Sequence, residues 1–576
     1  MSPFKRVCFF VPIMAIVLYA CGGAPTVSAP TAAEVESTTP AEPVATQALV
    51  ATEALATEAS AEPIALRFGW IGKPDTLNPA YAFLTESYTV FDLIYGTLVT
   101  ESPSGEYVGE LAQDWSVSED GLTWTFTLKD GITWHNGEPF TVDQMVWAIN
   151  AVMQNPEGWA TTANYVNGFK EVKALDEKTL QISLENPVGN LEYRTSFLYA
   201  VYPPDFERFT TAEELQNFAN DQPIGTGAFK VANFDKDKGI LILEAHKNYH
   251  NNPPKIDQII FQTFDNADAM VQALKVGDVD LIHEVPNSAF QAVQSFPNVK
   301  AIRQPGRGLA ELIINSVPAD HDPAPNRNPA LEDPQVRLAI AHAINKQDLV
   351  EIVLQGLGQP GTTIIPPSLG GGFWHNPLPD IPFDLELANQ ILDQAGYVME
   401  PDGVRAKDGI KLEMRLQYAS DSSVYPRVAD LISGWMRQIG IRATPEAVDP
   451  DSLTAALTPT GDYDLVIWGW GSDPDPDFML SVMTSEQFVE GGWSDSGYSN
   501  PEYDQLYLEQ QTTVDRAQRR QIIWRMQEMV FNDRPYIVLY YEDSLEAYRT
   551  DRFTGFIESP LGIEASISLR NVEPVQ

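Results

Sequence analysis

Cysteine is almost missing from this chain: its 576 residues contain two, Cys8 and Cys21. Cys8 lies in an N-terminal apolar segment that we expect to be removed, so one thiol would remain and no intrachain disulfide could form. Stability must therefore come from packed cores. Twelve tryptophans and an apolar fraction of 44% supply the material for them, and the chain beyond residue 63 is long enough for two or three domains.

Basic residues are also scarce. Lysine and arginine together number 37 against 79 aspartates and glutamates, which gives a formal net charge of −42 at pH 7. A nucleic-acid-binding protein needs a basic surface to offset phosphate repulsion, and this composition offers none. The charge excess is typical of a solvated acidic surface, so nucleic acid is excluded as a partner.

The N-terminal apolar segment 7–20 follows Lys5 and Arg6 and is shorter than the roughly 20 residues that a membrane-spanning helix needs. This pattern predicts a secretory signal peptide over residues 1–20. Leu18-Tyr19-Ala20-Cys21 resembles the bacterial lipobox, in which the cysteine thiol is acylated. We therefore expect a lipoprotein anchored at Cys21 outside the cytoplasm, in the periplasmic space or on the outer face of the plasma membrane; the alternative is an uncleaved anchor.

Lysine, arginine and aromatic residues are all absent from residues 22–62, which consist largely of Ala, Thr, Pro, Ser and Glu. Such a segment cannot bury enough apolar surface to fold. Residues 21–63 are therefore predicted to form a flexible linker between the lipid and the folded protein. A coil of this length spans about 35 Å on average.

Sequence motifs of enzymes and metal sites are missing as well. Neither H-E-x-x-H nor G-x-S-x-G occurs, so nothing predicts a hydrolase. His246 and His250 flank a segment that reads as a turn, and residues 473–484 lack the glycine and the final glutamate of a calcium loop. No enzyme activity, metal site or cofactor is predicted.

Strand and helix patterns alternate through the rest of the chain. Residues 123–128 alternate apolar and polar side chains, as in a strand with one buried face. Thr141, with Gln144 three residues later, is typical of a capping box, and Asp333 before Pro334 predicts another helix start. A further helix is expected between Asp384 and Gly396, and the apolar run 465–468 predicts a strand covered on both faces. The fold class is α/β.

One long segment carries a family resemblance. Residues 111–143 read LAQDWSVSEDGLTWTFTLKDGITWHNGEPFTVD, and this stretch resembles the hallmark of the extracytoplasmic solute-binding proteins of family 5, the receptors of oligopeptide, dipeptide and nickel ABC importers. Further matching segments follow in the expected order: 76–79, 223–230, 273–280, 334–345, 463–474, 497–504 and 534–537.

The resemblance implies a periplasmic-binding-protein fold of type II, with two hinged lobes and an extra α+β domain inserted in lobe 1. The chain is expected to pass between the lobes near residues 303 and 540. The expected boundaries are residues 64–104, 221–302 and 541–576 for domain I, 105–220 for the inserted domain II, and 303–540 for domain III.

The segment from Trp468 to Asp473 is the main candidate site, because it leaves an apolar strand at the end where open α/β sheets bind ligands. In peptide-binding relatives, the aspartate matching Asp473 holds the α-ammonium of the peptide; the alternative is that Asp473 caps a turn before Pro474. Ligand contacts are expected from residues of both lobes, namely Trp470, Gly471, Ser472, Asp473 and Tyr418 on one side and Leu84, Thr85 and Glu86 on the other.

The expected function is oligopeptide capture for an ABC permease by a monomeric receptor. A dipeptide is disfavoured because no arginine occurs between Arg415 and Arg427, where dipeptide receptors place one for the ligand carboxylate. Four alternatives stay open: a nickel-chelate receptor, a secreted peptidase, a signalling or chaperone-like surface receptor without a permease, and an oligosaccharide receptor in which aromatic rings stack on sugars. The candidate stacking residues are Trp468, Trp470, Trp493 and Tyr498.

Overall fold

The computed structural model describes residues 62–321, 325–375, 378–379 and 381–575. The predicted signal peptide, most of the predicted linker and Cys21 lie outside the described residues. The chain divides into two units, Met1–Pro63 and Ile64–Gln576, and the second is described below. Within the described residues, no helix is long and apolar enough to span a membrane.

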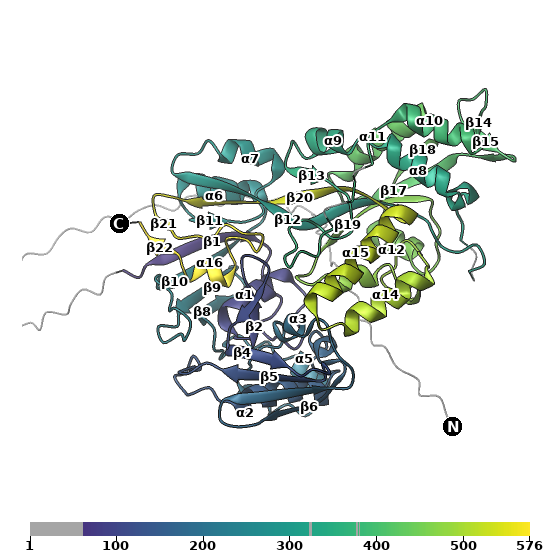
Figure 1. The fold of residues 1–576 in the computed structure, drawn as a ribbon. Coiled ribbons are helices and arrows are strands. Elements are labelled where there is room, and N and C mark those ends of the chain that lie inside the picture. Colours follow the sequence, from purple (N-terminus) through teal and green to yellow (C-terminus); the bar gives the residue numbers. More distant parts are fainter. Residues whose placement is uncertain (1–61, 322–324, 376–377, 380, 576) are drawn as a thin grey trace, which may run out of the picture. The chain divides into compact units, whose positions relative to one another are not determined.

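In the described part of the chain, eleven strands form one mixed sheet (Figure 1). In spatial order they are β18 (Arg442–Val448), β17 (Glu413–Ala419), β19 (Leu465–Gly471), β12 (Val299–Ile314), β20 (Tyr536–Arg549), β11 (Leu281–Ile282), β1 (Ala65–Ile71), β10 (Gln258–Phe264), β9 (Ile240–Ala245) and β8 (Phe229–Asp235), with β13 (Gly358–Pro360) also paired to β20.

The long antiparallel strands β12 and β20 join the two halves of this sheet. Their pairing is irregular between Pro305 and Leu309 and again at Glu311. On β12, Ile302 packs in the same core as β1, whereas Leu309 packs with β19. The apolar cores thus change along these two strands. We call the half from β18 to β19 lobe 2 and the half from β11 to β8 lobe 1.

Two layers of helices cover the sheet of lobe 2. Leu465 and Ile467 pack against one layer, formed by α8 (Pro334–Ala343), α10 (Leu385–Gln394) and α11 (Tyr425–Gln438). Val466 packs against the other, which contains α14 (Pro501–Thr512) and α15 (Arg516–Asp533). Burial on both faces is the physical reason for the continuous apolar run predicted at 465–468.

A separate antiparallel sheet is formed between residues 112 and 184, in the order β4 (Ala112–Val117), β5 (Thr123–Leu128), β7 (Thr179–Leu184) and β6 (Phe169–Ala174). The predicted alternation in β5 is confirmed, because its buried side chains share the core of lobe 1. Helix α2 (Val142–Gln154) covers this sheet and begins with the predicted capping box, in which the Thr141 N–H donates to Gln144 at 2.9 Å.

The predicted helix starts in lobe 2 are also confirmed. The Asp333 carboxylate accepts the Gln335 N–H at 2.9 Å, and Asp384 accepts the Leu387 N–H at 2.8 Å. Gly396 follows α10 with φ of 88°, a left-handed conformation that favours glycine.

Shorter elements complete the fold. The helices are α1 (Thr85–Ile94), α3 (Leu191–Thr195), α4 (Pro203–Phe206), α5 (Ala212–Gln216), α6 (Ala267–Val276), α7 (Asn287–Val293), α9 (Lys346–Asp348), α12 (Pro450–Leu457), α13 (Asp477–Ser481) and α16 (Ser566–Leu569), with 3₁₀ turns at Ala163–Val166, Pro329–Glu332 and Ser485–Gln487 and a π-turn at Leu349–Val353. Small sheets pair β2 (Val99–Glu101) with β3 (Tyr107–Gly109), β14 (Val398–Met399) with β15 (Arg405–Lys407) and β16 (Ile410–Lys411), and β21 (Phe553–Thr554) with β22 (Glu573–Pro574).

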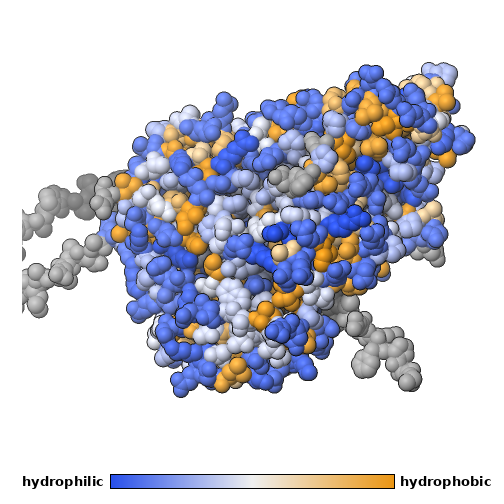
Figure 2. Space-filling view, in the orientation of Figure 1, coloured by the Kyte–Doolittle hydropathy of each residue, from blue (hydrophilic) through white to orange (hydrophobic). Residues whose placement is uncertain are grey.

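The visible surface is mostly hydrophilic (Figure 2). Apolar residues gather over α10 and the β14–β15 hairpin, where Leu387, Val398 and Met399 are exposed. The hydrophilic cover agrees with the excess of acidic residues in the sequence.

Candidate functional site

The candidate site begins where β19 ends. β19 runs parallel to β17 and antiparallel to β12, and Gly471 at its end pairs with Gly308. The Ser472 N–H then donates to the Arg307 carbonyl at 3.0 Å. A Cβ atom added to Gly308 or Gly471 would meet nothing within 4 Å, so this strip of backbone faces open space.

Asp473 lies directly after this strip and is half-buried. The Tyr193 hydroxyl of α3 donates to its Oδ2 at 3.0 Å. The Asp473 carboxylate accepts no other hydrogen bond from the described residues. The local turn is capped by Asp475 and not by Asp473, because the Asp475 carboxylate accepts the Asp477 N–H at 3.0 Å. Burial raises the pKa of Asp473, the Tyr193 hydrogen bond opposes that shift, and the nearby Asp475 charge adds to it.

A cation lies close to Asp473. Arg307 lies in the irregular part of β12, between Pro305 and Leu309, and its guanidinium forms an ion pair with Glu101 of β2. Its Nε atom is buried and has no partner among the described residues. The charge of Arg307 lowers the pKa of Asp473, which favours the ionised carboxylate.

Trp470 is held by a buried acid. Its indole N–H donates to Asp495 at 3.1 Å, and the Tyr536 hydroxyl donates to the other oxygen of the same carboxyl group. Burial raises the pKa of Asp495 to about 7. The Trp470 ring also packs edge-on against Phe478 and Trp493, at centroid distances of 5.8 and 6.5 Å. The orientation of Trp470 is therefore fixed from within lobe 2.

A buried ion pair supports the loop from below. The two terminal nitrogens of Arg519 donate to the Asp475 carboxylate at 2.6 Å, and Arg519 Nε donates to the Gln510 side-chain oxygen at 3.0 Å. The side chains of Arg519 and Asp475 are 2% and 3% exposed. This pair anchors the chain two residues after Asp473 to α15.

The predicted lobe 1 residues lie at the start of α1. Leu84 and Thr85 are exposed, and Glu86 is half-buried. The Glu86 carboxylate packs against Gly72 at the end of β1, and burial raises its pKa, with His283 after β11 opposing the shift. These residues therefore lie at the carboxyl ends of the parallel strands β1 and β11, which is where such sheets bind ligands.

Two other predicted residues, Tyr418 and Tyr498, pack against the cores of lobe 2. Tyr418 is half-buried on β17, level with Ile467 of β19, and packs against the α8–α11 layer. Tyr498 is buried against Tyr503, and its hydroxyl donates to Asp533. A buried ring cannot stack on a sugar, so Tyr498 is not a stacking residue of an oligosaccharide site.

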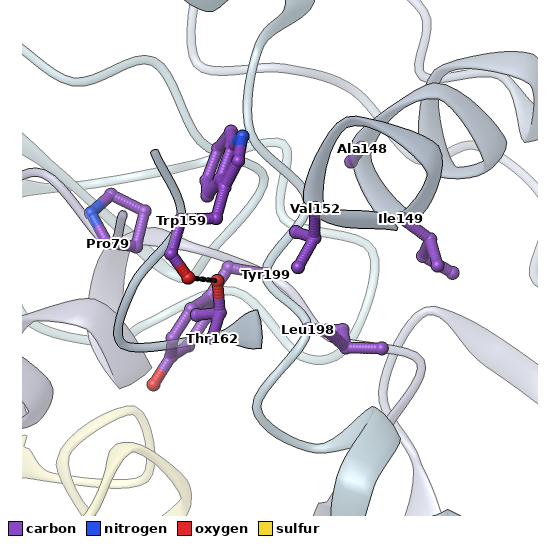
Figure 3. Close-up of a pocket in the computed structure, with 8 residues that line it drawn as sticks. All are labelled: Pro79, Ala148, Ile149, Val152, Trp159, Thr162, Leu198 and Tyr199. Carbon is purple, nitrogen blue, oxygen red and sulfur yellow. Dashed lines mark hydrogen bonds between the residues drawn. The ribbon is translucent and has the colours of Figure 1, made fainter. Parts of the chain in front are cut away.

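The structure also contains a small apolar cavity between the loop after Asn78, helix α2 and Tyr199 (Figure 3). Thr162 donates there to the Trp159 carbonyl at 3.3 Å. The volume of the cavity, about 10 Å³, is at the lower limit for one water molecule. This cavity is a packing defect and not a site for a solute.

No cluster of metal-binding side chains occurs within the described ranges. His246 Nδ1 bonds the Gly227 carbonyl at 3.1 Å, while His250 Nε2 bonds the Glu110 carbonyl at 3.2 Å. The two histidines suggested by the sequence therefore engage different backbone groups.

Sequence reasoning missed three residues of the candidate site: Tyr193, Arg307 and Arg519. Each reaches the loop after β19 from a distant part of the chain, and Tyr193 precedes its partner Asp473 by 280 residues. None lies in a motif that points to this loop. Arg519 is buried on the same helix as Ile523 and Met526, but a polar residue at such a position gives no sequence signal for burial.

Comparison with known proteins places this geometry in a family. The sequence model of the bacterial extracellular solute-binding proteins, family 5 (middle), matches residues 106–490. Heme-binding protein A of Haemophilus influenzae is 25% identical over 85% of this chain and 89% of its own length. Oligopeptide-binding protein AppA of Bacillus subtilis is 24% identical over 84% of this chain and 88% of its own.

The solved structures extend the likeness to the whole fold. The structure of AppA from Bacillus subtilis in complex with a nonapeptide has a TM-score of 0.67 against this chain, with 21% identity over 89% of this chain and 99% of AppA. The fold is thus a two-lobed binding protein of type II with the additional domain in lobe 1, as the sequence predicted.

Proposed function

Because this chain belongs to the bacterial extracellular solute-binding proteins of family 5, we propose that it is the receptor of an ABC importer, that it captures oligopeptides between its lobes, and that it delivers them to a membrane permease. The receptor is a transport protein and not an enzyme. The relatives include both heme-binding and oligopeptide-binding proteins, so the class of ligand is inferred from the site itself.

The position of the Asp473 carboxylate is the main support for a peptide ligand. Its carboxylate stands at the open end of β19 and has a neutral hydroxyl, Tyr193, as its hydrogen-bond donor. A partly desolvated carboxylate gains strongly from a charge-assisted bond to an ammonium group. Every peptide with a free N-terminus offers such a group, so Asp473 would bind the ligand without reading its sequence.

The uncovered backbone beside Asp473 supports the same ligand class. Gly308 and Gly471 face each other on the adjacent strands β12 and β19, and neither has a side chain to cover the backbone. An extended peptide can hydrogen-bond to such a backbone strip, and main-chain pairing gives affinity for many sequences. Trp470, Ser472 and Tyr418 would line this side, while Leu84, Thr85 and Glu86 would face it from lobe 1.

Contacts between the two sides of the protein support a closing motion. The Gly189 N–H of the inserted domain donates to the Gln511 carbonyl of α14 at 2.7 Å, and Tyr193 bonds Asp473. A ligand that touches both lobes would stabilise this arrangement by its differential affinity. The strands β12 and β20 would act as the hinge, with boundaries near residues 303 and 540 and the domain limits expected from the sequence.

We further propose that the protein is a monomer, anchored outside the cytoplasm by lipid on Cys21 with the linker 21–63 as a tether. Mass spectrometry of the N-terminal peptide from the native membrane fraction tests this part. A diacylglycerol-modified cysteine at residue 21 is expected, and an unmodified Cys21 behind an intact segment 1–20 would contradict it.

Calorimetry with a pentapeptide and its N-acetylated form tests the peptide proposal. The wild-type protein should bind the free peptide at least 10-fold more tightly than the acetylated one. Asp473→Asn should remove this difference, while Asp451→Asn, an exposed aspartate of α12, serves as the matched control. Equal binding of both peptides would contradict the ammonium anchor, and binding of a saccharide unaffected by Asp473→Asn would favour the sugar alternative.

A further inference from the structure

A second carboxylate lies on the hinge strand close to the candidate site. Glu542 of β20 pairs on one side with Gly358 of β13, and its carbonyl oxygen packs against Gly306 of β12 on the other. Its side chain is exposed. Within the described ranges its carboxylate has neither a hydrogen bond nor an ion pair, whereas the neighbouring Asp543 is paired with Arg303.

Protein atoms surround the exposed Glu542 side chain closely enough to affect its protonation. Burial alone raises the pKa of Glu542, and no neighbouring charge contributes to the shift. A carboxylate that water can reach, yet is crowded by protein atoms, would gain more from a cationic partner than an ordinary surface carboxylate does.

Two tyrosine hydroxyls share this environment. Tyr540 lies two residues before Glu542 on the same strand and therefore points to the same face of the sheet. It is fully buried, and its hydroxyl has no partner among the described residues. The Tyr425 hydroxyl of α11 is 2.8 Å from the position of a Cβ atom on Gly469, and no described residue bonds it. Burial raises the pKa of both tyrosines, and the charges of Glu542 and of the buried Glu311 add to the shift.

The unpaired polar atoms of Glu542, Tyr425 and Tyr540 favour one kind of partner, a cation with several N–H groups. A buried hydroxyl without a partner costs free energy, and native structures rarely leave one so. A carboxylate and two hydroxyl oxygens can all accept hydrogen bonds, and a guanidinium or ammonium group is donor-only with several N–H groups. A cationic side chain would thus satisfy all three groups together.

The position of the group fits a peptide held at Asp473. Gly471 pairs with Gly308, and the next residue of β12, Leu309, pairs with Tyr541. Gly471 and the Tyr541–Glu542 segment are therefore about two strand spacings apart, roughly 10 Å. An extended peptide rises about 3.3 Å per residue, so this distance corresponds to about three residues.

We propose that Glu542, with Tyr425 and Tyr540, forms a subsite for a lysine or arginine side chain of the bound peptide. The inference rests on the proposed function and narrows the ligand to oligopeptides that carry a basic residue near the third or fourth position. Asp473 would bind the N-terminal ammonium, and Glu542 the second positive charge.

Calorimetry with a matched pair of pentapeptides tests the subsite. Lysine is placed at each of positions two to five of an alanine-rich peptide, and norleucine replaces it in the partner peptide. The wild-type protein should prefer one lysine position by at least 10-fold. Glu542→Gln should abolish that preference and leave the norleucine peptide bound as before, and Tyr425→Phe should reduce the preference several-fold.

Glu509→Gln, which removes the same charge from an exposed site on α14, is the control and should keep the lysine preference. Tight binding of both peptides to the wild-type protein without any preference would overturn the subsite and leave the peptide function standing. A preference that survives Glu542→Gln would also overturn it. Failure of every peptide to bind would overturn the subsite together with the proposed function.

Discussion

The hydroxyl group of Tyr193 donates a hydrogen bond to the Asp473 carboxylate at 3.0 Å and so joins the inserted domain to the loop after β19. The two residues lie 280 positions apart. This contact orients the carboxylate that we propose to hold the peptide ammonium, and it does so with a neutral donor that leaves the negative charge free for the ligand.

Tyr193→Phe should lower peptide affinity by about 3- to 10-fold, because a hydrogen bond of this kind contributes on the order of 1 kcal/mol. The ring contacts with Tyr165 and Phe197 would be kept. Tyr202→Phe is the matched control, since its hydroxyl also donates to a carboxylate, that of Glu138. Calorimetry gives both affinities, and a Tyr193→Phe protein that binds as tightly as wild type would refute the orienting role.

Gly370→Ala should weaken peptide binding by hindering closure. Gly370 lies directly against the backbone of Gly105 in the β2–β3 turn, and an added methyl group would overlap that backbone. We expect at least a 10-fold loss of affinity and a larger radius of gyration in saturating peptide, measured by X-ray scattering. Gly434→Ala in α11, where nothing lies within 4 Å, should bind normally. Equal affinity of the two variants would argue against this contact as part of closure.

Arg519→Met should destabilise the protein by about 3–5 kcal/mol, because it leaves the Asp475 carboxylate buried without its cation. Urea unfolding monitored by tryptophan fluorescence measures the loss. Arg525→Met is the control: Arg525 is exposed and pairs with Glu502 and Glu528, and an exposed pair contributes about 0–1 kcal/mol. A loss below about 1 kcal/mol in Arg519→Met would contradict the anchoring role of the pair.

Asp495 should make the protein less stable as the pH rises. Its pKa is about 7 in the folded protein against an ordinary value of 3.8, so between these values the folded chain holds a proton that the unfolded chain has released. The stabilisation is complete below about pH 4 and is lost as the pH passes 7, by on the order of a few kcal/mol. Unfolding free energies at pH 5 and pH 8 should differ less in Asp495→Asn than in wild type, and identical differences would be inconsistent with this assignment.

Local features were predictable because their signals are local. The alternation in β5, the capping residues Thr141 and Asp333, and the apolar run of β19 each determine their element through nearby residues. Helix α15 was not predicted from periodicity, since Arg519 and Gln527 occupy its core-facing side. Buried polar residues interrupt the apolar stripe by which a helix is identified.

The candidate site was predictable only in part. The resemblance pointed to Asp473 and Trp470, but the partners that hold them, Tyr193 and Asp495, come from other parts of the chain. The exposed yet crowded position of Glu542 depends on the pairing of β20 with two other strands. Such relationships arise from long-range packing, which one sequence without its fold does not encode in any readable spacing.

Native mass spectrometry of the gently purified protein tests the central claim most directly, because it weighs and then fragments any solute that remains bound. The account predicts a series of masses that resolve into oligopeptides with free N-termini. A single mass that corresponds to a saccharide, a heme or a metal chelate would contradict it.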